Sequence, residues 1–136
     1  MVKAIVKYQG DLICNVEHGP SGSKILTDAP VDNMGKGSQF SPTDLVAAAL
    51  GSCIATTIAI LAKRKGWDVE GMHLEVEKIM SDDSPRRIRS LPVLVWMPQR
   101  LDTEKQAMVE KAAMTCPVHK SLHPDIESTI VFNWPD

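Results

Sequence analysis

The stretch SPTDLVAAALGSCIATTIAILA, residues 41–62, decides how this chain is expected to fold. The eighteen residues between Asp44 and Lys63 carry no charge, and Cys53 lies near their middle. Such a stretch can be a membrane span, a buried core helix or the seat of a reactive thiol. Its apolarity is modest, because it includes six alanines, one glycine, one serine and two threonines, and it is short for a membrane span. We therefore expect a core helix, since a helix that is apolar on nearly all sides usually forms the spine of a domain.

The ends of this helix carry recognisable signals. Ser41 is a good N-cap residue, Pro42 suits the first helical position, and Asp44 stands where a capping box places an acidic or amide side chain. Three basic residues, 63–65, precede Gly66, and positive charge is favourable at the C-terminal end of a helix. The pattern predicts a helix of about 24 residues, or about 36 Å, that ends near Gly66.

Alternating segments on both sides of this helix predict strands. Turn-forming residues separate them, and the expected strands are 3–8, 12–18, 23–29, 72–80, 86–97 and 127–134. Pro92 falls inside one of them and indicates an edge or a bulge. Strands, a long helix, strands, a helix and a final strand make an α+β fold, and the length suits a single domain over residues 1–136.

A second helix is predicted at residues 102–115, followed by a short one that begins at Pro117. In the helix predicted at 102–115, the apolar spacing places Met108, Ala112 and Met114–Thr115 on the buried side.

Composition and charge exclude several classes of function. The net charge is −2 and no basic run stands out, so nothing indicates nucleic-acid binding. The first residues, MVKAIVKYQGDLIC, lack the long apolar region of a signal peptide, and we expect a cytoplasmic protein that does not span a membrane. The chain has three widely spaced cysteines, an odd number that favours separate thiols, with at most one functional pair.

The three cysteines differ in their local context. Cys53 shares a helical face with Val46, Leu50, Thr57, Ile60 and Leu61, where a buried, inert thiol is the common outcome. Cys116 precedes Pro117, so it can cap a new helical turn whose N–H groups stabilise a thiolate, and His119 and Lys120 could add positive charge. Cys14 is expected to pack within a strand or lie at the surface.

Two further patterns have alternative interpretations. Cys116-x2-His119-x3-His123 has the spacing of metal ligands, with Cys53 as a possible fourth, so metal binding is a second hypothesis for this segment. The arginines at 86, 87 and 89 are expected to form a solvated strand face rather than an anion site.

The sequence resembles the OsmC/Ohr family, the osmotically inducible and organic-hydroperoxide-resistance proteins. The segments SPTDLVAAALGSC (41–53) and TCPVHKSLHP (115–124) carry the resemblance, together with the 62 residues that lie between Cys53 and Cys116. The order of the predicted elements also matches, so the resemblance covers nearly the whole chain. It implies an intertwined homodimer with a long buried central helix, antiparallel sheets and a second helix that bears a cysteine.

The resemblance also implies an activity. Cys53 matches the peroxidatic cysteine of the family and Cys116 its resolving cysteine, so the implied reaction is reduction of organic hydroperoxides through a Cys53 sulfenate and a Cys53–Cys116 disulfide. No bound cofactor is implied, and an external dithiol restores the thiols.

The chain departs from the best-defined peroxidases of the family at two places. They carry a glutamate where this chain has Thr43, and the nearest acid here is Asp44. They also carry an arginine in the N-terminal part, whereas the first arginine here is Arg64. Lys24, Lys36 or a partner subunit are candidate sources of the missing cation, as are His119 and Lys120 near Cys116. The departures leave a second hypothesis, a binding protein for a small hydrophobic or thiol ligand without peroxide turnover.

Overall fold

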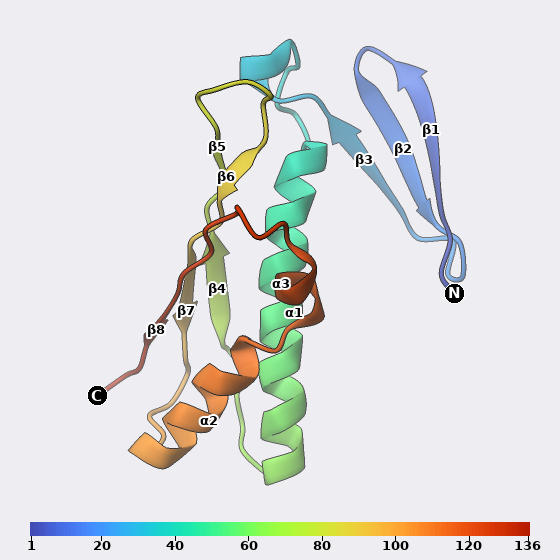
Figure 1. The fold of residues 1–136 in the computed structure, drawn as a ribbon. Helices are drawn as coiled ribbons and strands as arrows, with labels where there is room; N and C mark the ends of the chain where they lie inside the picture. Colours follow the sequence, from blue (N-terminus) through green and yellow to red (C-terminus); the bar gives the residue numbers. More distant parts are fainter. The chain divides into compact units, whose positions relative to one another are not determined.

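The computed structural model describes residues 1–136 and divides into two compact units, residues 1–46 and 47–136, with the long helix running from the first into the second. The single domain expected over residues 1–136 stays a prediction. The elements, coloured along the chain in Figure 1, are β1 (Ala4–Gly10), β2 (Ile13–His18), β3 (Lys24–Asp28), a 3-10 turn η1 (Val31–Asn33), α1 (Pro42–Lys65), β4 (His73–Val76), β5 (Ile79–Met80), β6 (Ile88–Ser90), β7 (Val93–Trp96), α2 (Thr103–Ala113), α3 (Pro117–Ser121) and β8 (Ile130–Asn133).

The first unit is an antiparallel sheet in the order β1-β2-β3. Asp11 and Leu12 adopt positive φ in the turn between β1 and β2, where the pairing register also shifts. Val6, Val16 and Ile25 are paired across the three strands and so share one face. Val6 and Ile25 are exposed on that face, so the sheet presents apolar side chains that this unit does not cover.

A buried carboxylate organises the loop that leads from β3 to α1. The Asp28 Oδ2 atom accepts hydrogen bonds from the backbone N–H and the hydroxyl of Ser38, at 3.1 and 2.6 Å. These bonds lower the pKa of Asp28, the side-chain bond having the largest effect. Gly35 lies against the backbone of Ala29, where an added Cβ would come within 1.7 Å of the carbonyl oxygen, so only glycine fits there.

The predicted ends of the long helix are confirmed in α1. The Ser41 N–H donates to Asp44 Oδ2 at 2.9 Å, and the Asp44 N–H donates to Ser41 Oγ at 3.1 Å, which is a reciprocal capping box. At the other end Gly66 has φ +76, and the Trp67 N–H returns to the Ala62 carbonyl at 2.8 Å. A left-handed glycine with this bond is a common way to end a helix.

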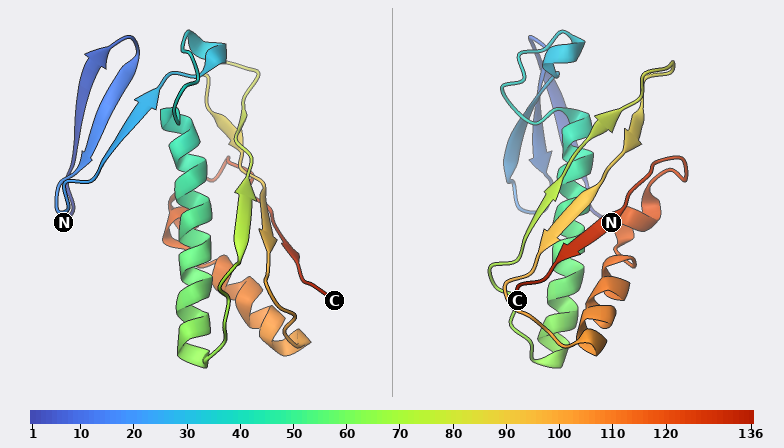
Figure 2. Two further views of the ribbon diagram at one scale, coloured as in Figure 1. Left: turned by 180° about the vertical axis from the view of Figure 1, so that it is seen from behind. Right: turned by 90° about the vertical axis from the view of Figure 1, so that its left-hand side faces the viewer.

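The second unit contains a sheet in the order β4-β7-β8 and a separate two-stranded sheet, β5-β6. β4 and β7 are antiparallel, as are β5 and β6, whereas β7 and β8 are parallel. The parallel pair follows from the connection, because α2 and α3 provide the long crossover that a parallel return needs. Figure 2 shows α1 and α2 on one side of this sheet.

Two of the predicted strands are each divided. Residues 72–80 form β4 and β5, and residues 86–97 form β6 and β7, with each half in a different sheet. Pro92 lies at the second break, and its carbonyl accepts from the Glu77 N–H at 3.1 Å. Because proline has no N–H to donate, pairing stops there, in agreement with the predicted interruption.

The core of the second unit lies between α1, the sheet and α2. Its fully or nearly fully buried apolar side chains come from Leu50, Ile54, Ile58, Ala62, Leu91, Val93, Val95, Val109 and Ala113. Gly51 lets α1 approach the sheet, because a Cβ at this position would lie 3.0 Å from Val76 Cγ2.

The buried faces of both helices differ from the predicted ones. On α1 the buried positions follow Leu50, Ile54 and Ile58, while Ile60, which was expected on the buried face, is 48% exposed. On α2 the buried positions are Val109 and Ala113, while Met114 and Thr115 lie beyond the end of the helix and are exposed. Helix α1 is apolar on nearly every side, so sequence spacing alone does not select the side that meets the sheet.

By length and composition α1 could cross a membrane, and it is the one helix in the chain that meets this test. The test is weak evidence, because core helices of globular proteins pass it as well. Within the single chain only 28% of its most apolar window is buried. Much of this apolar helix therefore needs a cover that the second unit does not supply.

Candidate functional site

Cys53 lies at the middle of α1 and is half-buried. The helix around it is regular: the hydroxyl of Thr57, one turn later, donates to the Cys53 carbonyl at 2.8 Å. Cys53 is offset from the buried row that contains Leu50 and Ile54, so its sulfur is not sealed in the core. A thiol in this position is held by a rigid element and remains partly accessible.

Cys116 is the N-cap residue of α3, as the sequence predicted, and Pro117 occupies the first helical position. Its sulfur accepts a hydrogen bond from the His119 N–H at 3.4 Å. Unlike Cys53, Cys116 is completely buried. The chain therefore presents one partly accessible thiol and one enclosed thiol.

The short helix α3 lies beside the middle of α1, the part of that helix that carries Cys53 (Figure 1). Burial raises the pKa of Cys116 above its ordinary value, and the nearby Cys53 thiol raises it further, against the lowering effect of the His119 N–H. The His119 N–H acts in the direction that the capping position suggested, but burial has the larger effect on the pKa of Cys116. All three cysteines are free thiols in this structure.

The supporting residues named from the sequence lie in two places. Thr43 and Asp44 belong to the first turn of α1, and Asp44 precedes Cys53 by nine residues, or about two and a half helical turns. His119 and Lys120 belong to α3 with the Cys116 cap, and Lys120 is exposed. The ring nitrogen Nδ1 of His119 is buried without a hydrogen-bond partner, a feature that no sequence signal indicated.

The structure does not support the metal hypothesis for Cys116, His119 and His123. No group of three or more His, Cys, Asp or Glu side chains has the arrangement to hold a metal ion. His123 Nδ1 instead accepts from the Asp125 N–H at 3.1 Å, on the surface. The ligand-like spacing here reflects a helix cap followed by a turn.

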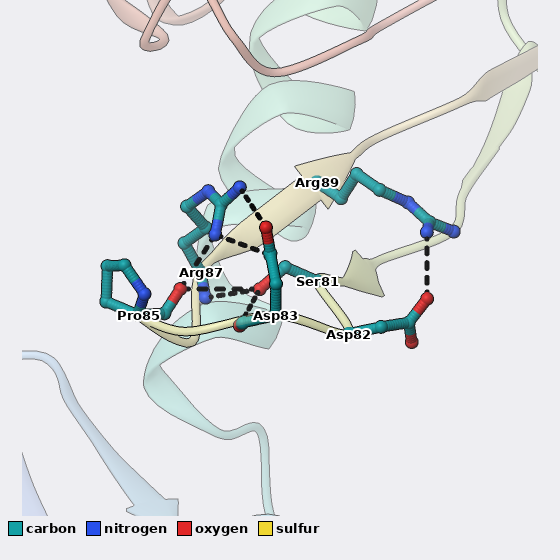
Figure 3. A network of polar contacts seen from close by, with 6 residues as sticks. All are labelled: Ser81, Asp82, Asp83, Pro85, Arg87 and Arg89. Carbon is teal, nitrogen blue, oxygen red and sulfur yellow. Dashed lines mark hydrogen bonds and ion pairs between the residues drawn. The ribbon is translucent and has the colours of Figure 1, made fainter.

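The arginines after β5 form a surface network, as expected (Figure 3). Arg87 contacts both carboxylate oxygens of Asp83, at 2.8 and 3.3 Å, and Arg89 contacts Asp82 at 3.2 Å. Hydrogen bonding to Arg87, followed by its charge, lowers the pKa of Asp83. These side chains are occupied with one another, so the network indicates no anion site.

Cys14 lies in a strand, unlike the other two cysteines, which belong to helices. It lies within β2, half-buried, between its strand partners Tyr8 and Thr27. This agrees with the expectation of strand packing.

Comparison with known proteins identifies the family. Residues 35–131, well over half of the chain, match the family of OsmC-like proteins. The chain belongs to the OsmC-like family. Its similarity to solved structures extends over almost the full length of both chains. A protein of Psychrobacter arcticus, described as a candidate osmotic stress induced and detoxification response protein, is 44% identical, with a TM-score of 0.92 and coverage of 98% of this chain and 96% of that one.

Two more distant structures share the fold of this OsmC-like chain. The organic hydroperoxide resistance protein OsmC of Legionella pneumophila is 19% identical, with a TM-score of 0.77 and coverage of 96% of each chain. The organic hydroperoxide resistance protein OhrB of Bacillus subtilis is 17% identical, with a TM-score of 0.73 and coverage of 98% of each chain. No curated protein matches the sequence. The predicted OsmC/Ohr membership and the α+β fold are thus confirmed.

Proposed function

We propose that this OsmC-like protein is a cysteine-based peroxidase that reduces organic hydroperoxides, with Cys53 as the peroxidatic and Cys116 as the resolving cysteine. The observation that carries the proposal is the placement of α3, with its enclosed Cys116 cap, beside the middle of α1, where Cys53 is partly accessible (Figure 1). Structures of the same fold include proteins named for organic hydroperoxide resistance, which supports the choice of substrate class.

In the first step the Cys53 thiolate attacks an oxygen of the hydroperoxide O–O bond. The S–O bond forms as the O–O bond breaks, so the substrate leaves as an alcohol after taking up a proton, and Cys53 becomes a sulfenic acid. The partial exposure of Cys53 gives the hydroperoxide access to the sulfur.

In the second step Cys116 attacks the Cys53 sulfenic acid and forms the disulfide. The raised pKa of Cys116 means that it brings its proton into this step, and that proton leaves with the sulfenic hydroxyl as water.

An external dithiol then restores both thiols through a mixed disulfide, and no bound cofactor is needed. His119 and Lys120 are proposed as supporting residues on the Cys116 side. Thr43 and Asp44 are proposed to support the site through the first turn of α1, where Asp44 also forms the capping box.

We also propose that the protein acts as a cytoplasmic homodimer. The side of α1 that the second unit leaves uncovered is lined mainly by small residues, which allow a second helix to approach closely. They are Ala48, Ala49, Ser52, Thr56 and Ile60. A second copy is proposed as the cover of this surface, in place of a membrane.

The test is hydroperoxide consumption with cumene hydroperoxide and dithiothreitol. We expect Cys53→Ser to reduce turnover to the rate of the uncatalysed reaction, because it removes the nucleophile. Cys14→Ser is the matched control, since it also removes a half-buried thiol, and it should retain full activity. In Cys116→Ser the first equivalent of peroxide should still react, leaving a sulfenic acid that dimedone traps. Unchanged turnover in Cys53→Ser would refute the proposal.

The absence of an arginine before Arg64 favours a second candidate, a binding protein for a small hydrophobic or thiol ligand. Native mass spectrometry of protein purified without added thiols distinguishes the two. A bound small molecule, together with no peroxide consumption by the reduced protein, would favour the binding function. Catalytic consumption that depends on Cys53 would reject it as the main function.

A further inference from the structure

One buried polar atom has no part in the reaction steps above. The ring nitrogen Nδ1 of His119 is enclosed and has no hydrogen-bond partner. Buried polar atoms in native proteins are nearly always paired, so an unpaired one in a titratable side chain requires an explanation. His119 is half-buried as a residue, so it encloses this nitrogen while part of the residue stays in contact with solvent.

The unpaired nitrogen belongs to a residue that contacts Cys116. The backbone N–H of His119 donates to the Cys116 sulfur at 3.4 Å. Nδ1 is on the side chain of the same residue, so it lies within one side chain's length of that sulfur. Both residues belong to α3 and its cap, which lie beside the part of α1 that carries Cys53 (Figure 1).

Cys116 needs a base in the step that forms the disulfide. It is completely buried, and a buried thiol keeps its proton because the thiolate is poorly solvated there. The attacking species in thiol chemistry is the thiolate, so the proton of Cys116 has to be taken up as the S–S bond forms.

The helices next to Cys116 offer one enclosed base. Residues 45–62 of α1 include no titratable side chain except that of Cys53. On α3 the titratable side chains are those of His119 and Lys120, and lysine is a cation that has no lone pair to offer. The carboxylate in the last turn of α2, Glu110, is exposed and accepts a hydrogen bond from an indole N–H.

We propose that His119 is the general base of the resolving step, with Nδ1 as the atom that takes the proton from Cys116. This role rests on the proposed peroxidase function. As the Cys116 sulfur bonds to the Cys53 sulfur, its S–H proton passes to Nδ1 and the sulfenic S–O bond breaks. The proton then goes to the departing hydroxide, so water leaves. Catalytic hydrogen bonds are often long at rest, so Nδ1 pairs with the thiol only in this step.

Step-resolved kinetics test this role. Reduced protein in a Cys14→Ser background is mixed with one equivalent of cumene hydroperoxide. Intact-protein mass spectrometry with dimedone trapping then follows the Cys53 sulfenic acid and the disulfide. In His119→Asn the sulfenic acid should form at the unchanged rate but persist about 100-fold longer, because it loses the general base. The backbone N–H that caps Cys116 is retained in this variant.

His123→Asn is the matched control. His123 is an exposed histidine that follows α3, and its replacement should leave the lifetime of the sulfenic acid unchanged. Equal lifetimes in His119→Asn and His123→Asn would overturn the role of Nδ1.

A measurement without a variant at position 119 guards against misfolding. If Nδ1 moves the proton as the S–S bond forms, the disulfide-forming step should be slower in deuterium oxide than in water. His119→Asn should lose this difference, which a merely structural role of the ring does not predict. A step that is equally fast in both solvents would contradict the proposed base.

An aromatic disulfide separates failure of this role from failure of the peroxidase. In Cys14→Ser protein, dithiodipyridine should release one thiopyridone on reaction at the partly accessible Cys53 and a second when Cys116 closes the disulfide. No peroxide is needed, and His119→Asn should slow only the second release. A slowed second release without peroxide turnover would refute the peroxidase and support the base. Turnover with an unchanged or absent second release would do the reverse.

Discussion

Three features of the Cys116 side chain act on its pKa. It caps α3 by accepting the His119 N–H, it is fully buried, and it lies near the Cys53 thiol. The first feature favours a thiolate and the other two favour a thiol, and the balance raises the pKa of Cys116. In the proposed reaction this makes Cys116 a proton carrier until Cys53 has been oxidised.

This pKa predicts how stability depends on pH. Because the pKa of Cys116 is raised in the folded protein, its contribution to stability is present below the ordinary thiol pKa, near 9.0, and is lost as the pH rises through the folded value. We expect the free energy of unfolding of the reduced protein to fall between about pH 8 and about pH 10 more steeply than in Cys116→Ala. Urea denaturation under reducing conditions at both pH values measures this, and equal slopes would contradict it.

The side of the long helix α1 that packs against the sheet includes a residue without a side chain, Gly51. Gly51 faces Val76 across the contact with β4, at a distance where a Cβ would be tight. Glycine costs helix stability, by about 1 kcal/mol relative to alanine, so its presence here is explained by the close approach of the sheet.

A double-mutant cycle tests this packing. Gly51→Ala alone should be near neutral or destabilising, because the gain in helix propensity is offset by the contact with Val76. In a Val76→Ala background the same change should stabilise, which gives a coupling energy of about 0.5–1 kcal/mol. Chemical denaturation of the four proteins supplies the numbers. Additive effects would mean that Val76 does not restrict position 51.

At the scale of the whole molecule, one side of α1 is left uncovered by the second unit, residues 47–136. Ile60 is 48% exposed on it, and the first unit presents a further apolar sheet face. An apolar helix this exposed has a strong tendency to acquire a partner. The proposed homodimer satisfies that need with a second copy of the same surface.

Light scattering after size exclusion should give a mass near twice the 14.9 kDa of one chain. Ile60→Lys should shift this mass toward the single chain, because a buried interface position would then carry an unpaired charge. Met114→Lys is the matched control: Met114 is 44% exposed at the end of α2, and its replacement should leave the mass unchanged. If Ile60→Lys has no effect, α1 is not the interface.

The sequence by itself determined the order of helices and strands, the two ends of α1 and the cap at Cys116, because capping boxes, proline positions and alternation act over a few neighbouring residues. It also identified the family, through the segments around Cys53 and Cys116. Only the tertiary structure decided which side of α1 is buried, since that helix is apolar all round. It likewise decided the division of residues 72–80 and 86–97 between two sheets, and the burial that raises the pKa of Cys116. These depend on burial and on contacts between residues far apart in the chain, which local patterns do not encode.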